Sequence, residues 1–499
     1  MPRPTTVLLL LRLLLVSLLC FSSAALPLPP RFVSAEAPPT VQQVAALPGF
    51  DGALPFRLET GYLAVDEDNG AELFYYFIES EGDPRRDPVL LWLNGGDHCT
   101  VLSAIFFEIG PLKLVVEPYN GTGVPRLRYH PYSWTKAASV LFVDSPVGSG
   151  FSFSRNPQGY DVGDVSSSLQ LKEFLTKWFA EHPDYLVNPF YVGGDSYAGK
   201  IVPFLVQKIS EGTIDQWSTT TWTSCYFSDI EAGLKPTVNL KGYLVGNPVT
   251  GDRVDHGSRV PFLHGAGIIS DQLYEAIMDN CQGEDYTKPK NALCAQALER
   301  FKRLLNEIWK EHILYKKCIS VSARPNDGST GRKILKEETG LLKHPPPRPP
   351  MECLSYVNYL SYFWANNNIT RKILGIKKGT VDEWVRCHDG DLPFKQDIDN
   401  SIKYHRNVTS KGYRALIYSG DHDATIPFLG TQSWVRSLNF PIVDDWRVWH
   451  LHGQSAGFTI TYRNNMTFAT IKGGGHTAPE FQPERCFAMF KRWISNEPL

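Results

Sequence analysis

The sequence predicts an α/β fold in which a mostly parallel central sheet is flanked by helices and interrupted by a helical cap insertion. Two observations support this fold class. Strand-like apolar runs alternate with helical patterns, as in the strand–helix units of parallel sheets. The pattern then becomes helical and irregular over residues 252–368. The strand-like runs are residues 73–78, 89–93, 140–143, 190–192 and 240–245, and the clearest helical pattern is residues 166–181.

Length and composition limit the functional classes. The chain has 499 residues, of which 42% are hydrophobic and 20% charged, so it is globular and long enough to bury a large core. Its formal net charge is −2 and it has no basic tract, which argues against nucleic acid as a partner and against electrostatic attachment to membranes. We expect a core in two parts, residues 45–251 and 369–499, with the cap insertion of residues 252–368 between them.

The N-terminal segment has the pattern of a signal peptide. Arg3 precedes the apolar run Val7–Leu19, and small residues follow up to Ala25, near which we expect cleavage. No later segment reaches the roughly eighteen apolar residues of a membrane span, so we expect residues 1–25 to direct a chain without a membrane anchor into the secretory pathway. Four sequons for N-glycosylation fit this route: Asn120, Asn368, Asn407 and Asn465.

The first chemical signal is the glycine-rich turn Asn94-Gly95-Gly96, which follows the apolar run Val89–Leu93. Glycines after an early strand suit an oxyanion hole, where backbone amides point at the oxygen that gains charge in a tetrahedral intermediate. We expect the amide of Gly96 to be one such donor. The alternative is that the two glycines only form a turn.

The second signal is the segment Gly194–Gly199, which lies between the apolar run 190–192 and a helical pattern over residues 200–210. A serine on a sharp strand-to-helix turn needs small neighbours and presents its hydroxyl at a helix N-terminus. Ser196 is therefore the candidate nucleophile, and the amide of Tyr197 the second oxyanion donor. Ala198 departs from the G-x-S-x-G pattern by one methyl group, and a core serine beside a tight turn is the alternative.

The cap insertion carries two helical patterns and one segment that cannot enter a core. Residues 271–279 and the amphipathic stretch 292–313 are predicted helices. Residues 322–350 are polar, basic and rich in proline, which predicts an exposed linker.

Two strand-like runs near the C-terminus end in titratable residues. The run 415–418 precedes Ser419-Gly420-Asp421-His422-Asp423, and the run 468–471 precedes three glycines and His476. The order Ser, Asp, His is that of the α/β-hydrolases. His476 is therefore the candidate general base and acid. Both Asp421 and Asp423 are candidates to orient it, and the other is then a turn residue.

Cysteine usage agrees with a secreted chain. Eight cysteines remain when Cys20 of the signal peptide is set aside, and an even number indicates disulfides without giving their pairing. No cysteine and histidine spacing resembles a zinc site, so we expect no metal and no cofactor.

Six segments of the chain occur in the order and spacing of the serine carboxypeptidases, and the similarity covers about residues 47–499. More narrowly, the chain resembles the plant serine carboxypeptidase-like acyltransferases, which move acyl groups from sugar esters to other molecules. The resemblance implies Ser196, Asp423 and His476 as the catalytic triad, with Gly96 and Tyr197 as amide donors. The segments are Trp92–Gly96, Phe107–Pro111, Asp144–Gly148, Gly194–Gly199, Gly420–Asp423 and Gly475–His476.

The resemblance also implies covalent features. It pairs Cys99 with Cys387, Cys281 with Cys294, and Cys318 with Cys353. Cys225 and Cys486 are left as buried thiols. Related proteins often lose a linker such as residues 322–350, so we expect partial cleavage into two chains held together by disulfides.

The departures from the family pattern concern substrate binding. Serine carboxypeptidases hold the substrate's C-terminal carboxylate with an asparagine and two glutamates, next to the glycine turn that contains Gly95. This chain keeps Asn94 and Glu108 but has Asp195 before the nucleophile, with a carboxyl group about 1.5 Å shorter in reach. Acyltransferases of this family often carry aspartate there, so Asp195 favours acyl transfer over proteolysis.

A second departure follows the glycine pair, where Asp97 and His98 replace the proline and glycine of the peptidases. They are candidates to contact a sugar hydroxyl or an acyl group, and a surface ion pair is the alternative.

The resulting hypothesis is an acyltransferase in which Ser196 takes an acyl group from a 1-O-acyl-glucose and passes it to an acceptor hydroxyl. A serine carboxypeptidase acting at acid pH is the alternative, and a non-catalytic binding protein fits less well because the triad is complete. We expect a monomer, or a two-chain heterodimer after cleavage of the linker, in the vacuole or outside the cell.

Overall fold

The structure is a computed structural model that describes residues 41–96, 98–214, 238–318, 345–388 and 390–499. Contacts divide the chain into two units, Met1–Pro39 and Thr40–Leu499, and the first lies outside the described residues. The predicted signal peptide, Asp97, Cys225 and most of the predicted linker also lie outside them.

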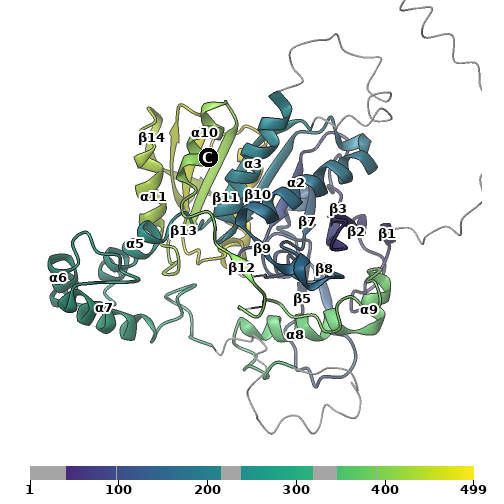
Figure 1. The fold of residues 1–499 in the computed structure, drawn as a ribbon, viewed down its shortest axis with the longest axis horizontal. Coiled ribbons are helices and arrows are strands. Elements are labelled where there is room, and N and C mark those ends of the chain that lie inside the picture. The colour runs from purple at the N-terminus through teal and green to yellow at the C-terminus, as the bar shows by residue number, and fades with distance from the viewer. Residues whose placement is uncertain (1–40, 97, 215–237, 319–344, 389) are drawn as a thin grey trace, which may run out of the picture. The chain divides into compact units, whose positions relative to one another are not determined.

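Six parallel strands form the centre of a twelve-stranded sheet, which confirms the predicted fold class (Figure 1). Each central strand is fully buried or nearly so, as expected for strands covered on both faces. In spatial order they are β7 (Ser139–Val143), β4 (Val89–Leu93), β10 (Phe190–Asp195), β11 (Leu240–Gly246), β13 (Arg414–Gly420) and β16 (Met466–Ile471).

Antiparallel strands extend the sheet on both sides. Beside β7 lie β3 (Ala71–Ile78), β2 (Leu58–Asp66) and β1 (Val41–Val44), with β8 (Phe153–Ser154) paired to β3. Beside β16 lie β15 (Gln454–Tyr462) and β14 (Ile442–Leu451). Two small sheets pair β5 (Leu112–Leu114) with β6 (Leu127–Tyr129) and β9 (Val162–Gly163) with β12 (Phe394–Lys395).

Helices cover both faces of the sheet because side chains alternate along each strand. In β4, Leu91 and Leu93 enter one core and Leu90 and Trp92 the other. The first core is completed by α2 (Asp164–Glu181), α3 (Ala198–Ile214), α10 (Ile402–Ser410) and α11 (Phe428–Ser437). The second is completed by the π-helix η1 (Ala104–Glu108), α8 (Ser355–Asn366), α12 (Ala478–Phe481) and α13 (Pro483–Ile494). Short 3₁₀ turns are η2 (Trp134–Lys136), η3 (Pro157–Tyr160) and η4 (Pro183–Tyr185).

Between β11 and β13, the regular elements of the described residues are helices apart from β12, and turns and irregular segments connect them. Helices α5 (Asp252–Gly265), α6 (Asp271–Asn280) and α7 (Ala292–Leu305) share an apolar cluster of their own, and Figure 1 shows α6 beside α7. By contrast, α8 places Tyr356 and Leu360 in a core of the central sheet, and α9 (Asn368–Ile373) follows it.

One predicted helix boundary is wrong. The pattern over residues 292–313 predicts a continuous helix, but α7 ends at Leu305 and is capped by Asn306. Lys310, Glu311 and Ile313 form backbone hydrogen bonds with the loops after β13 and β16, and His312 N donates to Trp309 O in a tight turn, so no regular helix continues. Tertiary contacts therefore override the apolar periodicity in this stretch.

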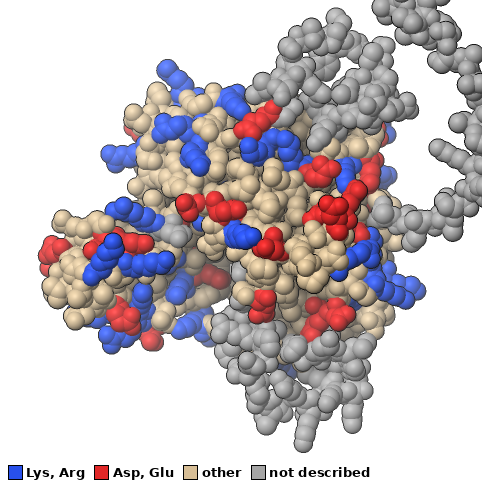
Figure 2. Space-filling model, in the orientation of Figure 1, with Lys and Arg blue, Asp and Glu red and all other residues tan. Residues whose placement is uncertain are grey.

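The surface shows no concentration of one charge on the face drawn in Figure 2, where lysine and arginine are interspersed with aspartate and glutamate. This distribution accords with the near-zero net charge of the chain. Within the described part of the chain, no helix is both long and apolar enough to cross a membrane.

Candidate active site

The turn between β10 and α3 holds Ser196 in a left-handed backbone conformation, with φ of +50°. This backbone conformation is higher in energy for a residue other than glycine, so it persists only where the surrounding structure imposes it. Here the Ser196 amide donates to Gly246 O (2.9 Å), and the Ser196 carbonyl accepts from Val249 N (2.8 Å). The neighbouring strand β11 thus fixes the serine at the carboxyl end of the sheet.

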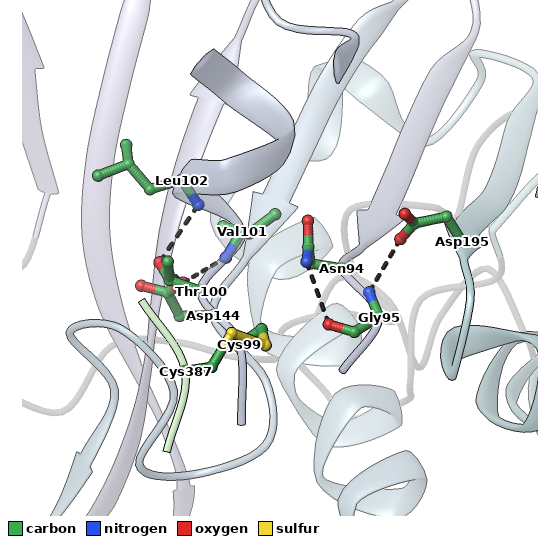
Figure 3. Close-up of a disulfide and its surroundings, with 9 residues drawn as sticks. All are labelled: Asn94, Gly95, Cys99, Thr100, Val101, Leu102, Asp144, Asp195 and Cys387. Carbon is green, nitrogen blue, oxygen red and sulfur yellow. Dashed lines mark hydrogen bonds between the residues drawn. A yellow bond between two sulfur atoms is a disulfide. The ribbon is translucent and has the colours of Figure 1, made fainter. Parts of the chain in front are cut away.

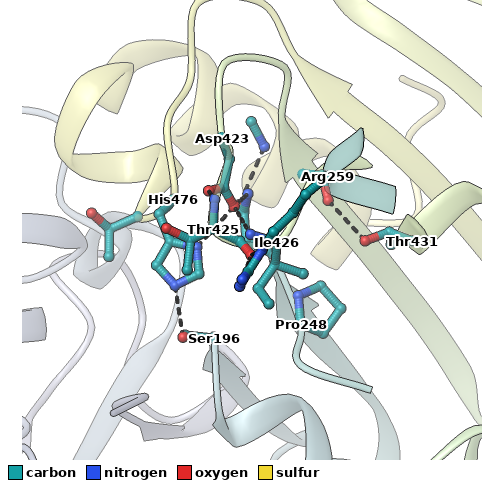
Figure 4. A network of polar contacts seen from close by, with 12 residues as sticks. Ser196, Pro248, Arg259, Asp423, Thr425, Ile426, Thr431 and His476 are labelled. Carbon is teal, nitrogen blue, oxygen red and sulfur yellow. Dashed lines mark hydrogen bonds and ion pairs between the residues drawn. The ribbon is translucent and has the colours of Figure 1, made fainter. Parts of the chain in front are cut away.

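His476 connects Ser196 to Asp423, as Figure 4 shows. Its Nε2 lies 2.7 Å from Ser196 Oγ, and its Nδ1 lies 2.8 Å from Asp423 Oδ2. Asp423 is fully buried and His476 is 8% exposed. Hydroxyl, imidazole and carboxylate therefore form a continuous chain of hydrogen bonds, the arrangement that activates a serine nucleophile.

The structure distinguishes the two aspartates that the sequence left open. Asp423 accepts hydrogen bonds from Thr425 N (2.7 Å), Ile426 N (3.2 Å) and Asn247 Nδ2 (2.8 Å), which aim its carboxylate at His476. Asp421 Oδ1 instead accepts from Gly473 N at 2.7 Å and lies 2.5 Å from His422 Nδ1. Asp421 is thus the loop-forming residue.

Asn247 is a positioning residue that the sequence analysis missed. It follows β11 directly, has φ of +42°, and its Oδ1 accepts from Gly420 N at 3.2 Å. Its position two residues beyond the predicted strand 240–245 was the available signal, because polar residues at the carboxyl ends of parallel strands meet at one edge of the sheet.

The protonation of His476 reflects opposing effects. Burial lowers the pKa of the imidazole, but the charge of Asp423 and the hydrogen bond with it outweigh burial. Together with the charges of Glu311 and Asp195, they raise this pKa to about 9. The imidazolium that forms when Ser196 loses its proton is therefore stabilised.

The glycine turn after β4 packs directly against the nucleophile turn. A Cβ on Gly95 would lie 2.5 Å from Ser196 Cβ and 3.0 Å from Tyr197 N, so only glycine fits. Gly96 follows with φ of +85°. The two turns that carry the expected amide donors are thus in contact beside Ser196 Oγ, and the donor roles of Gly96 and Tyr197 stay a prediction.

The residues expected to bind substrate gather around the same turn (Figure 3). Asp195 Oδ1 accepts from Gly95 N at 2.9 Å, and Asn94 Nδ2 donates to Gly95 O at 3.1 Å. Glu108 ends the π-helix η1 and is 3% exposed. Its Oε2 and Asn94 Oδ1 have no hydrogen-bond partner among the described residues, so both can serve a ligand.

Three carboxyl groups influence one another here. Burial raises the pKa of Glu108 well above its usual range, and the charges of Asp195 and Glu480 act in the same direction. Burial also raises the pKa of Asp195 to about 6 and that of Glu480 to about 7. The surroundings of Glu108 therefore favour its neutral form, which can donate a hydrogen bond. Glu480, on the short helix α12, was missed because nothing in its sequence pattern separates it from a solvated helix residue.

The three disulfides have the pairing that the resemblance implied: Cys99–Cys387, Cys281–Cys294 and Cys318–Cys353. Cys486 is a free, buried thiol on α13. Among the described residues, no group of three or more potential ligand side chains is arranged to hold a metal ion.

His98, beside the first disulfide, is 1% exposed and its ring packs against those of Phe394 and His388. His98 is therefore a buried residue and not a surface residue. The four sequon asparagines are exposed: Asn120, Asn368, Asn407 and Asn465.

Comparison with known proteins extends these observations. The chain matches the serine carboxypeptidase family over residues 48–496. Serine carboxypeptidase-like 19 and serine carboxypeptidase-like 3 of Arabidopsis thaliana are each 45% identical to it, over 91% of this chain and 94% and 93% of their own lengths. Among solved structures, Kex1Δp, a prohormone-processing carboxypeptidase from Saccharomyces cerevisiae, matches with a TM-score of 0.67 at 18% identity. That match covers 91% of this chain and 96% of the other, and at this identity it concerns the fold alone.

Proposed function

The chain belongs to the serine carboxypeptidase family of enzymes, and from this premise we propose that it is an acyltransferase. It moves an acyl group from a 1-O-acyl-glucose, through an ester on Ser196, to the hydroxyl of an acceptor. The three disulfides fit a protein of the secretory pathway. We propose a vacuolar or extracellular location, and a monomer or a two-chain form joined by Cys318–Cys353.

The reaction follows from the hydrogen-bonded triad. Ser196 Oγ attacks the ester carbonyl while His476 Nε2 takes its proton, and Asp423 stabilises the imidazolium. The amides of Gly96 and Tyr197 stabilise the oxyanion, at about 3–4 kcal/mol each. Glucose then leaves with the proton from His476, and the acyl group stays on Ser196.

The second half-reaction reverses these roles. The acceptor hydroxyl gives its proton to His476 and attacks the acyl-enzyme, which regenerates Ser196. Water competes for the same ester, so the acceptor succeeds only when it is aligned, since aligned groups reach effective concentrations of about 10⁵ M or more.

The aspartate at position 195 is the main reason to propose acyl transfer instead of proteolysis. Its carboxylate is bound to Gly95 N at 2.9 Å, and it is one methylene shorter than the glutamate of the peptidases. A substrate carboxylate placed for that glutamate therefore lacks one of its three partners. A neutral sugar needs no such partner and can use Asn94 and Glu108, which retain unpartnered polar atoms.

The test uses purified mature protein and its Ser196→Ala variant. Each is incubated with benzoyl- and cinnamoyl-type glucose esters and mixed hydroxyl acceptors, and separately with a blocked dipeptide at mildly acid pH. Products are read by mass. We expect Ser196-dependent acyl transfer. Release of a C-terminal amino acid alone would instead establish the second candidate, a carboxypeptidase, which Asn94 and Glu108 favour. Absence of both reactions would favour a binding protein.

The Asp195→Glu variant should gain peptidase activity. A longer carboxyl group reaches the substrate carboxylate, and a charge-assisted hydrogen bond contributes about 1.5–3 kcal/mol, so kcat/KM for the dipeptide should rise about tenfold or more. Asp161→Glu, a surface residue paired with Lys395, is the matched control. An unchanged ratio of dipeptide hydrolysis to acyl transfer would show that side-chain length at residue 195 does not set the reaction.

A further inference from the structure

Residues Lys310–Ile313, here called the strap, connect the insertion with the loop that carries Asp423 and the loop that carries His476. The strap's carbonyl groups accept hydrogen bonds from His476 N (to Glu311 O, 2.7 Å) and from Ala424 N (to Lys310 O, 2.8 Å). In return, Ile313 N donates to His422 O at 3.1 Å. One short segment thus binds the residue that provides the catalytic imidazole and the residues on either side of Asp423.

His312 anchors the strap. His312 is 2% exposed, and its Nε2 lies 3.2 Å from Gly473 O in residues 472–476, the loop that leads to His476 and is here called the base loop. Leu314 N donates to His312 Nδ1 at 3.3 Å, which assigns the ring proton to Nε2. The ring also packs against those of His422 and Phe481, at centroid distances of 5.3 and 4.7 Å. His312 therefore fixes the strap to Gly473 of the base loop and to the neighbouring rings of His422 and Phe481.

The approach of the strap explains one glycine. A Cβ on Gly475 would lie 2.4 Å from Glu311 O and 2.9 Å from His312 Cδ2. Only glycine lets the base loop come this close, and the residue after it is His476. Contact between the strap and the base loop is thus built into the sequence of both segments.

The side chain of Glu311 adds a charge to this arrangement. It is exposed, unlike Asp423 and Asp195, and all three carboxylates act on the His476 imidazole. Glu311 belongs to the insertion, Asp423 to the loop after β13, and Asp195 to the end of β10. The charge of Glu311 also acts on Glu480 of α12.

We propose that the strap is part of the catalytic apparatus, with His312 and Glu311 as positioning residues. His312 locks the strap so that the backbone of Glu311 holds His476 in line with Ser196 and Asp423, and the Glu311 carboxylate adds to the negative charge that Asp423 provides at the imidazole. The proposal rests on the nucleophilic role of Ser196 in the proposed function. Its test does not depend on which acyl donor the enzyme uses.

The first measurement is the second-order rate of Ser196 modification by diisopropyl fluorophosphate, followed by intact mass. In this reaction Ser196 Oγ bonds to phosphorus, fluoride leaves and His476 takes the serine proton. We expect His312→Ala to slow the reaction about 10–100-fold. His312→Gln should recover most of the rate, since its Nε2 can still donate to Gly473 O. His264→Ala, which removes a ring stacked on Tyr274 in the same insertion, should react like the wild type.

The second measurement is the pH dependence of the same reaction. Removing the charge of Glu311 lowers the pKa of His476, so the acid limb of the profile in Glu311→Gln should move to lower pH. Glu307, an exposed glutamate three residues before the strap, gives the matched control Glu307→Gln, which should keep the wild-type profile.

These outcomes separate the two proposals. A folded His312→Ala protein that reacts at the wild-type rate, or a Glu311→Gln profile that coincides with that of Glu307→Gln, would overturn the role of the strap. Far-ultraviolet circular dichroism and the thermal midpoint establish folding, and His312→Gln provides the result if His312→Ala does not fold. A wild-type protein that labels at Ser196 but transfers no acyl group would overturn the acyltransferase proposal alone. A wild type that does not label would overturn both.

Discussion

The Asp423→Asn variant is expected to lose about 10⁴-fold in kcat for its acyl donor, while Asp421→Asn stays within about threefold of the wild type. The two residues lie in one loop, both are aspartates, and the sequence alone makes both candidates. Their hydrogen bonds in the structure make them unequal, because only Asp423 contacts the His476 ring.

The size of the loss comes from the tautomer of His476. In the neutral imidazole, the Asp423 carboxylate at Nδ1 favours the tautomer with the proton on Nδ1, which leaves Nε2 free to accept the Ser196 proton. An asparagine amide directed at Nδ1 donates instead, so the ring proton moves to Nε2 and the base is lost. Asn247 Nδ2 and Ile426 N also donate to Asp423 Oδ2, so an amide NH2 at that position leaves these two donors without their acceptor in addition to removing the catalytic tautomer.

Steady-state acyl transfer and the fluorophosphate reaction both measure this effect. The two variants should show the same circular dichroism spectrum and thermal midpoint as the wild type within a few degrees. A larger loss in Asp421→Asn than in Asp423→Asn would assign the acid to Asp421 and contradict the geometry.

The parts of the site that the sequence predicts are those that follow strands. Gly95, Ser196 and His476 each come within five residues of the end of an apolar run, and parallel strands bring such residues to one edge of the sheet. The sequence could not choose between Asp421 and Asp423. The two residues are two positions apart in one loop, and the sequence does not tell which side chain points toward His476. In the structure, Asn247, which follows strand β11, helps to aim Asp423 at His476.

The sequence did not predict the strap, because its contacts do not follow from the end of a strand. The stretch after Leu305 continues an apolar spacing that suits a helix, and the sequence gives no sign that Lys310 and Glu311 bond to loops more than a hundred residues away. Backbone hydrogen bonds of this kind use no particular side chain. Only His312 and Gly475 depend on these contacts through their residue type, and neither residue stands out in the sequence when it is considered alone.

Asp144 is the residue whose removal should cost the most stability among those described here. It is fully buried at the end of β7, and Figure 3 shows it beneath the segment that follows the glycine turn. Its Oδ1 accepts from Thr100 Oγ1 (2.7 Å) and Val101 N (2.8 Å), and its Oδ2 from Phe151 N (2.9 Å). One carboxylate therefore satisfies three buried donors in two separate segments.

The pKa of Asp144 gives the pH dependence of this contribution. Burial raises the pKa to about 6, against the hydrogen bonds from Phe151, Thr100 and Val101, which lower it. The folded state thus binds a proton more tightly than the unfolded state, whose aspartate titrates near pH 3.9. The contribution of Asp144 to stability is therefore greatest below about pH 4 and decreases as the pH rises through about 6.

The Asp144→Ala variant should lose about 3–5 kcal/mol in free energy of unfolding, since each unsatisfied buried donor costs about 1–3 kcal/mol. Urea unfolding followed by tryptophan fluorescence, with disulfides intact, measures the loss. Asp161→Ala, which breaks an exposed pair with Lys395, is the control and should cost under about 1 kcal/mol.

Asp144→Asn should remove the pH dependence between about 4 and 6, so its deficit in free energy of unfolding relative to the wild type should shrink as the pH rises. A loss equal to that of the control would mean that Thr100, Val101 and Phe151 find other partners. The segment beside the glycine turn would then be held by its other contacts, among them the Cys99–Cys387 disulfide and the hydrogen bond from Thr100 N to Arg386 O.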